Sequence, residues 1–133
     1  MESKETIAMN YRLGYKAQLA DAFAIQTSLR PEEDIHTEFI TLLTCGMITI
    51  SRAYAWDLAS GPTVNTKSTV IPSCVHDAIY QLVYQGLLPV ECLRQADFEL
   101  EKIGCRAGMW KVRARLWRIG LGSSIGKLWR KLA

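Results

Sequence analysis

The sequence predicts an α+β fold: a small antiparallel β-sheet in the N-terminal half, then two antiparallel helices and a basic C-terminal helix. Three observations lead to this prediction. Short apolar runs with partial alternation occur over residues 11–53, a pattern typical of half-buried strands. From residue 72 onward, apolar side chains recur at helical spacing. Residues 106–133 contain eight lysines and arginines and no acid, whereas residues 1–105 contain eight lysines and arginines and thirteen acids, so the C-terminal segment differs physically from the rest.

The length of 133 residues suits a single domain over residues 1–133, in which we expect residues 1–10 to be flexible. An apolar content of 49% is enough for a hydrophobic core. No window holds about 18 uninterrupted apolar residues, and the polar start "MESKETIAMN" has no apolar core, so we expect neither a transmembrane helix nor a secretory signal. The four cysteines show no C-x-x-C spacing, which favours reduced thiols over a zinc site.

We expect about four short strands in the first part of the chain. The apolar runs that predict them are "YKAQL" (15–19), "AFAIQT" (22–27), "FITLL" (39–43) and "MITISRAYAW" (47–56). The turn "TCGM" between the last two runs predicts a hairpin. Residues 57–71 contain Gly61-Pro62 and then a series of polar residues, which is typical of a loop.

The first helix is predicted to begin at Pro72-Ser73, with Ser73 as its N-cap. It should run to Tyr84 or Gln85 and end at Gly86.

The second helix is predicted to have Pro89 in its first turn, Glu91 near its N-terminus and Gly104 at its end. A third helical stretch is expected over residues 109–119, within the basic amphipathic segment 106–133.

Two ionisable residues lie on the apolar faces of the first two helices. His76 shares its face with Ile79, Tyr80, Val83 and Leu87, and Asp97 shares its face with Leu93, Ala96 and Leu100. A carboxylate in an apolar stripe costs several kcal/mol unless it is paired or hydrogen-bonded. Because the short connection makes the helices antiparallel neighbours, we predict a contact between His76 and Asp97. Such an aspartate orients the imidazole and raises the basicity of its other nitrogen, as in a general base that acts on water.

The remaining acids of these helices are expected to lie elsewhere. Glu91, Glu99 and Glu101 fall mostly outside the apolar face of the second helix. Asp77 is about 100° round the first helix from His76, so we expect it to point toward the preceding loop. There it could bind a hard cation together with carbonyls of the loop 57–62. A structural interpretation stays open, in which His76 hydrogen-bonds the loop and Asp77 complements the helix dipole.

The order of these motifs resembles the phospholipase A2 superfamily. The matching residues are His76-Asp77-x-x-Tyr80, the preceding loop "WDLASGP" and Ala96-Asp97-Phe98 on the second helix. Members of that superfamily share an H-D-x-x-Y helix, a calcium loop before it and a second aspartate on the antiparallel helix. The resemblance implies that His76 is the general base that activates water and that Asp97 orients it. It also implies that Tyr80 supports this network through its hydroxyl.

The same resemblance implies calcium as the cofactor. Asp77 would be its bidentate ligand, and carbonyls near Trp56, Leu58 and Ser60 would complete the shell. Calcium and a loop N–H would stabilise the oxyanion that forms at the ester carbonyl. The chain departs from the pattern at Leu58, where the superfamily prefers glycine, and at Ser73, where phospholipases place a half-cystine.

A second resemblance covers most of the chain. The stretches "YKAQLADAFAIQT", "YAWDLASGPTVNTK" and "VHDAIYQL" are similar to a family of short phage and prophage proteins of unassigned function. It implies a phage or prophage origin, with the protein in the cytoplasm of the infected bacterial host or associated with the virion.

The basic C-terminal segment interleaves cations with tryptophans. Its candidate binding residues are Trp110, Lys111, Arg115, Trp117, Arg118 and Trp129. We order four interpretations: packing on the protein's own core with a basic outer face, adsorption to an anionic membrane, binding to a phage or host protein, and last, binding to nucleic acid. The segment has no base-reading motif.

Two hypotheses about function follow. The first is a phage protein that hydrolyses lipid esters at a membrane with a calcium-dependent, phospholipase A2-like site. The alternative is a non-enzymatic phage virion or accessory protein that binds a protein partner through its basic tail, which Leu58 in the loop favours.

Overall fold

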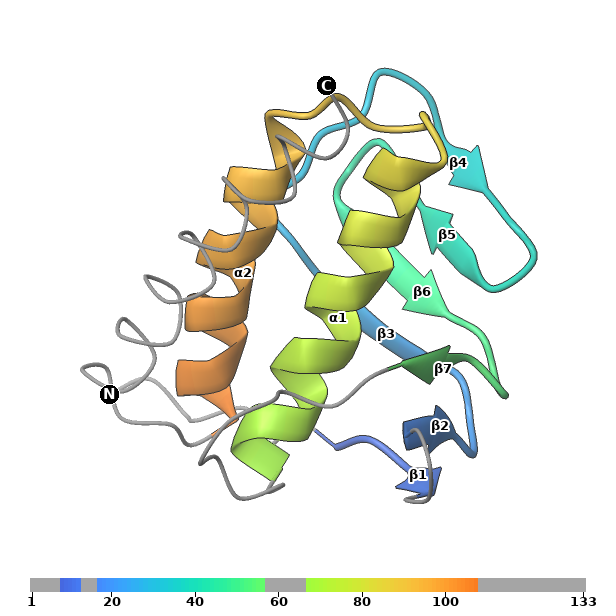
Figure 1. The fold of residues 1–133 in the computed structure, drawn as a ribbon, viewed down its shortest axis with the longest axis vertical. Coiled ribbons are helices and arrows are strands. Elements are labelled where there is room, and N and C mark those ends of the chain that lie inside the picture. The colour runs from blue at the N-terminus through green and yellow to red at the C-terminus, as the bar shows by residue number, and fades with distance from the viewer. Residues whose placement is uncertain (1–7, 13–16, 57–66, 108–133) are drawn as a thin grey trace.

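The structure is a computed structural model that describes residues 8–12, 17–56 and 67–107. Its elements are β1 (Tyr11–Arg12), β2 (Ala17–Leu19), β3 (Phe23–Gln26), β4 (Ile35–His36), β5 (Ile40–Leu42), β6 (Met47–Ile50), β7 (Ala55–Trp56), α1 (Lys67–Tyr84) and α2 (Cys92–Arg106). The strands occupy the N-terminal half and both helices follow, which confirms the predicted α+β class (Figure 1).

The strands form two antiparallel sheets rather than one. The first has the order β1-β2-β7 and the second the order β3-β6-β5-β4. The described residues therefore contain seven strands where about four were predicted. Strands β1 and β4 are two residues long, too short for an alternating pattern to indicate them.

The predicted strand 47–56 is in fact two strands, β6 and β7, which belong to different sheets. A turn separates them, in which Ala53 has a φ of 75° and its N–H donates to the carbonyl of Leu19 at 2.9 Å. An alanine seldom adopts this left-handed conformation, so the residue type at this position does not predict the turn.

Alternation of side chains explains the second sheet. In β3, Phe23 and Ile25 are buried while Ala24 and Gln26 are exposed. Phe23 lies opposite Ile50 of β6, and Ile25 lies opposite Ile48, so apolar pairs face the same side. Burial of each such side chain contributes about 1.5–3 kcal/mol.

The hairpin predicted at "TCGM" is present between β5 and β6. The N–H of Gly46 donates to the carbonyl of Leu43 at 2.8 Å, and Gly46 has a φ of 94°. A β-carbon at Gly46 would also collide with the backbone oxygens of Thr27 and Leu29, so both the conformation and the space require glycine.

Helix α1 begins five residues earlier than predicted, and Pro72 lies inside it. Pro72 removes one intrahelical N–H, yet the helix continues because its buried side packs on the rest of the protein. Ser73 is therefore not an N-cap: its hydroxyl donates to the carbonyl of Val70 at 2.8 Å, as a serine within a helix can. The predicted end is correct, because Gly86 has a φ of 76° and its N–H donates to Val83 at 3.0 Å.

Helix α2 begins after a turn in which the N–H of Cys92 donates to the carbonyl of Pro89 at 3.0 Å. Pro89 thus precedes the helix instead of lying in its first turn. Gly104 was predicted to end α2 but is buried within it, and the helix reaches Arg106. Packing keeps Gly104 helical despite its low propensity, because its lack of a side chain suits a buried position.

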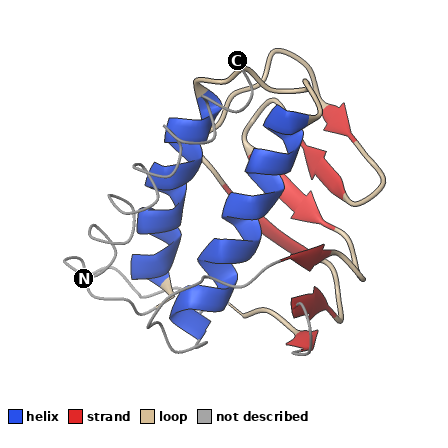
Figure 2. Cartoon of the chain, viewed as in Figure 1, coloured by secondary structure: helices blue, strands red, loops and turns tan. Residues whose placement is uncertain are grey.

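The two helices are antiparallel neighbours, as predicted, and α1 lies between α2 and the strands (Figures 1 and 2). Helix α1 contributes the largest share of the core. Its fully enclosed residues are Val70, Ile71, Cys74, Val75, Ala78, Ile79 and Leu82. All four cysteines of the chain are free thiols. In the part of the chain that the structure describes, no helix is long and apolar enough to cross a membrane.

Candidate functional site

The centre of the candidate site is a buried contact between α1 and α2. Nε2 of His76 lies 2.7 Å from Oδ1 of Asp97, and the two residues are 6% and 4% exposed. This contact was predicted from helical periodicity alone and is confirmed. A carboxylate accepts hydrogen bonds and donates none, so the proton of the neutral imidazole is on Nε2. Nδ1 then has a free lone pair and can accept a proton.

Tyr80 completes this centre from one turn further along α1. Its hydroxyl donates to Oδ1 of Asp97 at 2.9 Å, and its ring lies against that of His76 with a centroid separation of 4.1 Å. Asp97 therefore accepts two hydrogen bonds, which compensate for its loss of solvation. The ring contact also limits rotation of the imidazole.

The pKa of His76 is raised above its ordinary value of 6.5. Burial by itself would lower this pKa, but the carboxylates of Asp77 and Asp97 together outweigh it because they stabilise the imidazolium form. Without a cation on Asp77, the histidine is therefore a stronger base than a free imidazole. It also holds its proton to a higher pH.

The pKa of Tyr80 is raised as well, first by burial and then by the negative charge and the hydrogen bond of Asp97. The phenol consequently stays protonated across the physiological range and remains a hydrogen-bond donor. Its role is structural support of the carboxylate, because an uncharged donor with a high pKa exchanges no proton near neutral pH.

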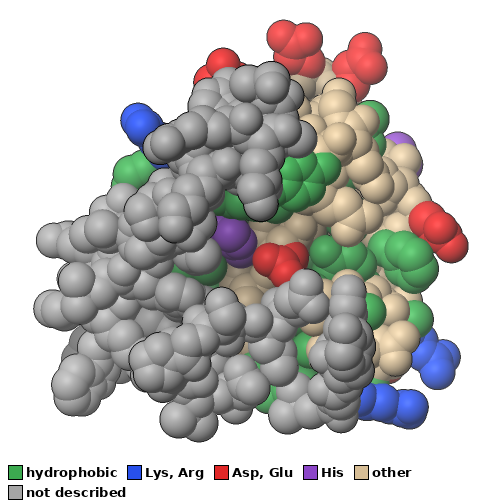
Figure 3. All heavy atoms as spheres, in the orientation of Figure 1, with side chains coloured by type: hydrophobic (Ala, Val, Ile, Leu, Met, Phe, Trp, Pro, Cys, Tyr) green, Lys and Arg blue, Asp and Glu red, His purple; other side chains and the backbone are tan. Residues whose placement is uncertain are grey.

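Asp77 lies at the outer edge of this centre. Its carboxylate is 3.6 Å from Nδ1 of His76, too far for a direct hydrogen bond, and its side chain is 36% exposed. In Figure 3, a histidine and an acidic side chain lie next to each other at the surface in the middle of the face where α1 is in front. The side of His76 away from Asp97 is thus the one that faces a carboxylate.

The chemistry of Asp77 fits a hard cation. Among the described residues it makes no ion pair with a lysine or arginine, so its negative charge is not neutralised there. A partly exposed carboxylate oxygen is a preferred ligand of calcium. The described residues hold no group of three or more His, Cys, Asp or Glu side chains that could bind a metal. The further ligands that the sequence predicts are backbone oxygens.

The other predicted calcium ligands are only partly described. Trp56 is the last residue of β7 and is buried, with its ring stacked on Tyr54 at a centroid separation of 6.2 Å. Leu58 and Ser60 lie outside the described residues. So do the candidate binding residues of the tail, Trp110, Lys111, Arg115, Trp117, Arg118 and Trp129, together with the helix expected over 109–119.

Sequence reasoning missed one contact beside the site. Nε1–H of Trp56 donates to the hydroxyl oxygen of Ser73 at 3.0 Å, which joins the end of β7 to α1. No periodic pattern predicts such a contact, because the partners are 17 residues apart on different elements.

Glu99 was also missed, as a buried residue. It lies off the face of α2 that carries Asp97, as expected, but it is only 2% exposed. Its Oε1 accepts the backbone N–H of Ser28 at 2.6 Å and a second hydrogen bond from the hydroxyl of Ser28. Glu99 therefore connects α2 to the segment after β3 and takes no part in the His76 centre.

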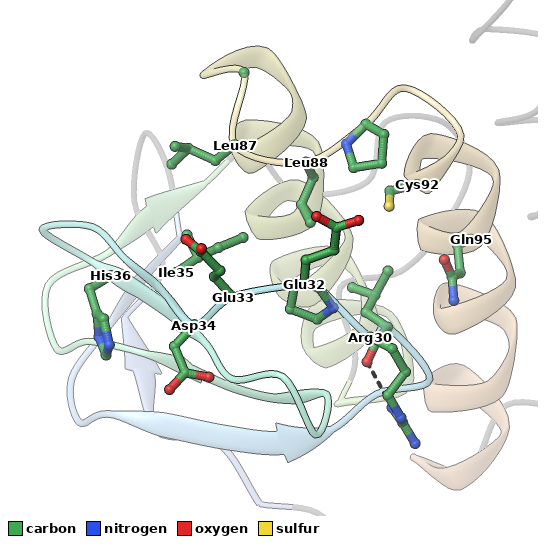
Figure 4. Close-up of a pocket in the computed structure, with 14 residues that line it drawn as sticks. Arg30, Glu32, Glu33, Asp34, Ile35, His36, Leu87, Leu88, Cys92 and Gln95 are labelled. Atoms are coloured by element: carbon green, nitrogen blue, oxygen red, sulfur yellow. Dashed lines mark hydrogen bonds between the residues drawn. The ribbon is translucent and has the colours of Figure 1, made fainter.

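A cavity of about 850 Å³ lies elsewhere, between the segment after β3 and the connection from α1 to α2 (Figure 4). Its lining includes the carboxylates of Glu32, Glu33 and Asp34 and the side chains of Leu87 and Leu88. None of its lining residues belongs to the His76 centre, so the chemistry of that centre does not use this cavity.

A scan against protein-family models finds no match, and searches of curated proteins and of solved structures find no significant match either.

Proposed function

We propose that the protein hydrolyses lipid esters at a membrane surface, with a calcium-dependent, phospholipase A2-like site. One observation supports this proposal above the others: the buried contact of 2.7 Å between His76 and Asp97, with Tyr80 bonded to the same carboxylate oxygen. An oriented histidine whose second nitrogen faces outward is the arrangement that general-base attack by water needs.

In this proposal, Nδ1 of His76 removes a proton from a water molecule while the water oxygen attacks the ester carbonyl carbon. Asp97 stabilises the imidazolium that forms, through its hydrogen bond to Nε2–H. When the carbon–oxygen bond to the alcohol breaks, Nδ1–H returns the proton to the leaving oxygen. The products are a carboxylic acid and an alcohol, and His76 ends in its starting state.

Asp77 would hold the calcium ion, with backbone carbonyls of Trp56, Leu58 and Ser60 as further ligands. A bound calcium ion supplies positive charge that stabilises the oxyanion of the ester carbonyl. The ion would also neutralise Asp77 and so remove one of the charges that raise the pKa of His76.

The composition of the tail supports action at a membrane. Residues 106–133 combine eight lysines and arginines with three tryptophans, which suits adsorption to anionic headgroups. The phage or prophage origin remains part of the proposal and is supported by the sequence motifs given above.

The second candidate is a non-enzymatic phage virion or accessory protein that binds a protein partner through its tail. Leu58 favours it, because a leucine after the loop aspartate is less suited than glycine to close approach of the backbone to an ion.

Release of fatty acid from vesicles of mixed zwitterionic and anionic phospholipid separates the two candidates. We expect release with calcium and none with a chelator, and we expect His76→Gln to lower the rate by about 10²- to 10⁴-fold. The matched control is His36→Gln, which changes the exposed second histidine of the chain on β4 and should leave the rate unchanged.

An absence of calcium-dependent release by the wild-type protein, or a fully active His76→Gln variant, would rule out the enzymatic proposal. Co-purification with a phage or host protein, lost on truncation after Cys105 and unaffected by Asp77→Asn, would support the second candidate.

A further inference from the structure

The cavity of about 850 Å³ beside the connection from α1 to α2 has an apolar floor. Leu29, Leu88 and Cys92 form part of this floor and are 1%, 6% and 9% exposed. The same connection places Leu87 at the edge of the cavity, with 45% of the residue still exposed. A single exposed leucine is ordinary, but one that adjoins a concave apolar surface enlarges the apolar area that a partner can cover.

Two exposed glutamates form the opposite wall of the cavity. Figure 4 shows Glu32 and Glu33 extending from the segment after β3 toward the connection that carries Leu87 and Leu88. Neither carboxylate forms an ion pair or a side-chain hydrogen bond with another of the described residues. Two negative charges therefore lie beside apolar side chains and are available to an incoming cation.

The remaining Asp and Arg side chains of the lining are occupied by backbone contacts. Oδ1 of Asp34 accepts the backbone N–H of Thr44 at 2.8 Å. Nη1 of Arg30 donates to the carbonyl of Leu29 at 2.7 Å and to that of Thr27 at 3.0 Å. In Figure 4 the side chain of Arg30 points away from the two glutamates. The arginine of the lining therefore does not neutralise the acidic wall.

We propose that this cavity is a docking site for a basic segment of a partner protein, one that carries an apolar side chain next to its lysines or arginines. The apolar side chain covers Leu87 and Leu88 while the cations pair with Glu32 and Glu33. Charge complementarity selects this chemistry, because an acidic or uncharged apolar segment would desolvate the two carboxylates without pairing them. The volume lies within the range of about 300–1,000 Å³ that is typical of small binding sites, so the partner inserts a few side chains.

This docking site is separate from both functions proposed above. None of its lining residues belongs to the His76 centre, so it does not depend on lipid hydrolysis. It also differs from the second candidate function, which places a partner on the basic tail of the chain.

The test uses the full chain and a labelled peptide of about fifteen residues, built only from lysine and leucine with the leucines at helical spacing. Fluorescence anisotropy measures its affinity, and NMR amide shifts locate where it binds. We expect saturable binding with shifts over residues 29–36 and 86–92. A peptide with glutamate in place of lysine should not bind, and one with serine in place of leucine should bind at least about tenfold more weakly.

Two variants test the apolar and the acidic side of the cavity, each with a matched control. Leu87→Ser should weaken peptide binding by about tenfold, whereas Phe98→Ser, on α2 outside the cavity and also 45% exposed, should not. Glu33→Gln should weaken binding by about threefold at low salt, whereas Glu38→Gln, an exposed glutamate between β4 and β5 and outside the cavity, should leave it unchanged. Leu87→Ser and Glu33→Gln change exposed side chains, so their Tm should stay close to that of the wild type.

Binding that both variants weaken and both controls keep would support the docking site. The absence of saturable binding by the wild type at about 1 mM peptide would overturn it. Equal affinity for the peptide with serine in place of leucine would also overturn it, because charge attraction alone would then explain the binding. The same conclusion would follow if a variant and its control lost equal affinity.

Two other occupants of the cavity would overturn the proposal as well. A second copy of the chain would show as salt-sensitive dimerisation in analytical ultracentrifugation, abolished by Leu87→Ser. The chain's own basic residues 106–133 would show in the absence of peptide, because Leu87→Ser would then shift the NMR signals of those residues.

Discussion

Replacement of Asp97 by asparagine is expected to remove most of the hydrolytic activity while the fold persists. Oδ1 of Asp97 accepts hydrogen bonds from His76 at 2.7 Å and from Tyr80 at 2.9 Å. Asparagine has nearly the same shape and one carbonyl oxygen, so it can still accept. It has no negative charge, however, and therefore no longer stabilises the imidazolium that forms when His76 takes a proton from water.

The magnitude follows from this loss of charge. General-base catalysis contributes about 10²- to 10⁴-fold to rates, and an uncharged partner removes much of it, so we expect kcat to fall by at least about 10²-fold. Because tenfold corresponds to about 1.4 kcal/mol, the barrier rises by roughly 2.7 kcal/mol. Hydrogen bonds to a buried charged group contribute about 1.5–3 kcal/mol, so the free energy of unfolding should fall by about 1–3 kcal/mol.

The assay compares fatty acid release at saturating calcium with thermal unfolding of the same variants. The chain offers a matched control in Glu99→Gln, because Glu99 is the second buried carboxylate of α2 and bonds Ser28 instead of His76. Glu99→Gln should cost a similar amount of stability with little change in kcat. In the calcium-free protein, NMR titration should show a lower pKa for His76 in Asp97→Asn and an unchanged pKa in Glu99→Gln.

Two results would refute this reasoning. Wild-type kcat in Asp97→Asn would show that the carboxylate has no part in the reaction. Equal losses in Asp97→Asn and Glu99→Gln, in proportion to their loss of stability, would show that the activity reports folding alone.

Four further predictions concern His76, Tyr80 and the hairpin glycine Gly46. The pKa of His76 in the folded, calcium-free protein is raised above 6.5, so the protonated histidine stabilises the fold below pH 6.5. This stabilisation is lost as the pH rises through the folded pKa. Urea unfolding from pH 5 to 9 should show the fall in the free energy of unfolding, and His76→Gln should abolish it. A general base is active only when it is deprotonated. The rate at limiting calcium should therefore rise as the pH passes through the pKa of His76. Tyr80→Phe removes one of the two hydrogen bonds to Asp97 and should lower kcat by about three- to tenfold, measured by fatty acid release, whereas a loss as large as that of His76→Gln would contradict a supporting role. Gly46→Ala should lower the free energy of unfolding by at least about 1 kcal/mol in a denaturant titration, because it adds a β-carbon at positive φ against two backbone oxygens; an unchanged midpoint would show that the turn relaxes freely.

The contact between His76 and Asp97 could be predicted because the sequence pattern around each residue is local. Each residue lies within an apolar stripe of helical period, and a short connection makes the two helices antiparallel neighbours. The end of α1 was predictable for a similar reason, since Gly86 supplies the left-handed residue that closes a helix.

The remaining features depend on contacts between distant segments. The start of α1 was predicted wrongly because Pro72 is a good helix start in isolation, whereas packing of Val70 and Ile71 keeps the preceding turns helical. The bond between Trp56 and Ser73 and the burial of Glu99 both join segments that only the folded chain brings together. Local patterns hold no information about such partners.

The bond between Ser28 and Glu99 has a consequence for the order of folding. It connects residues 71 positions apart in the chain, so it closes a loop that contains the four strands β4 to β7 and helix α1. We expect a contact of such long sequence separation to form late in folding, because the loop between its partners must close first. We therefore expect Glu99 to affect the rate at which the native protein unfolds, and so its lifetime, more than the rate at which the chain first folds.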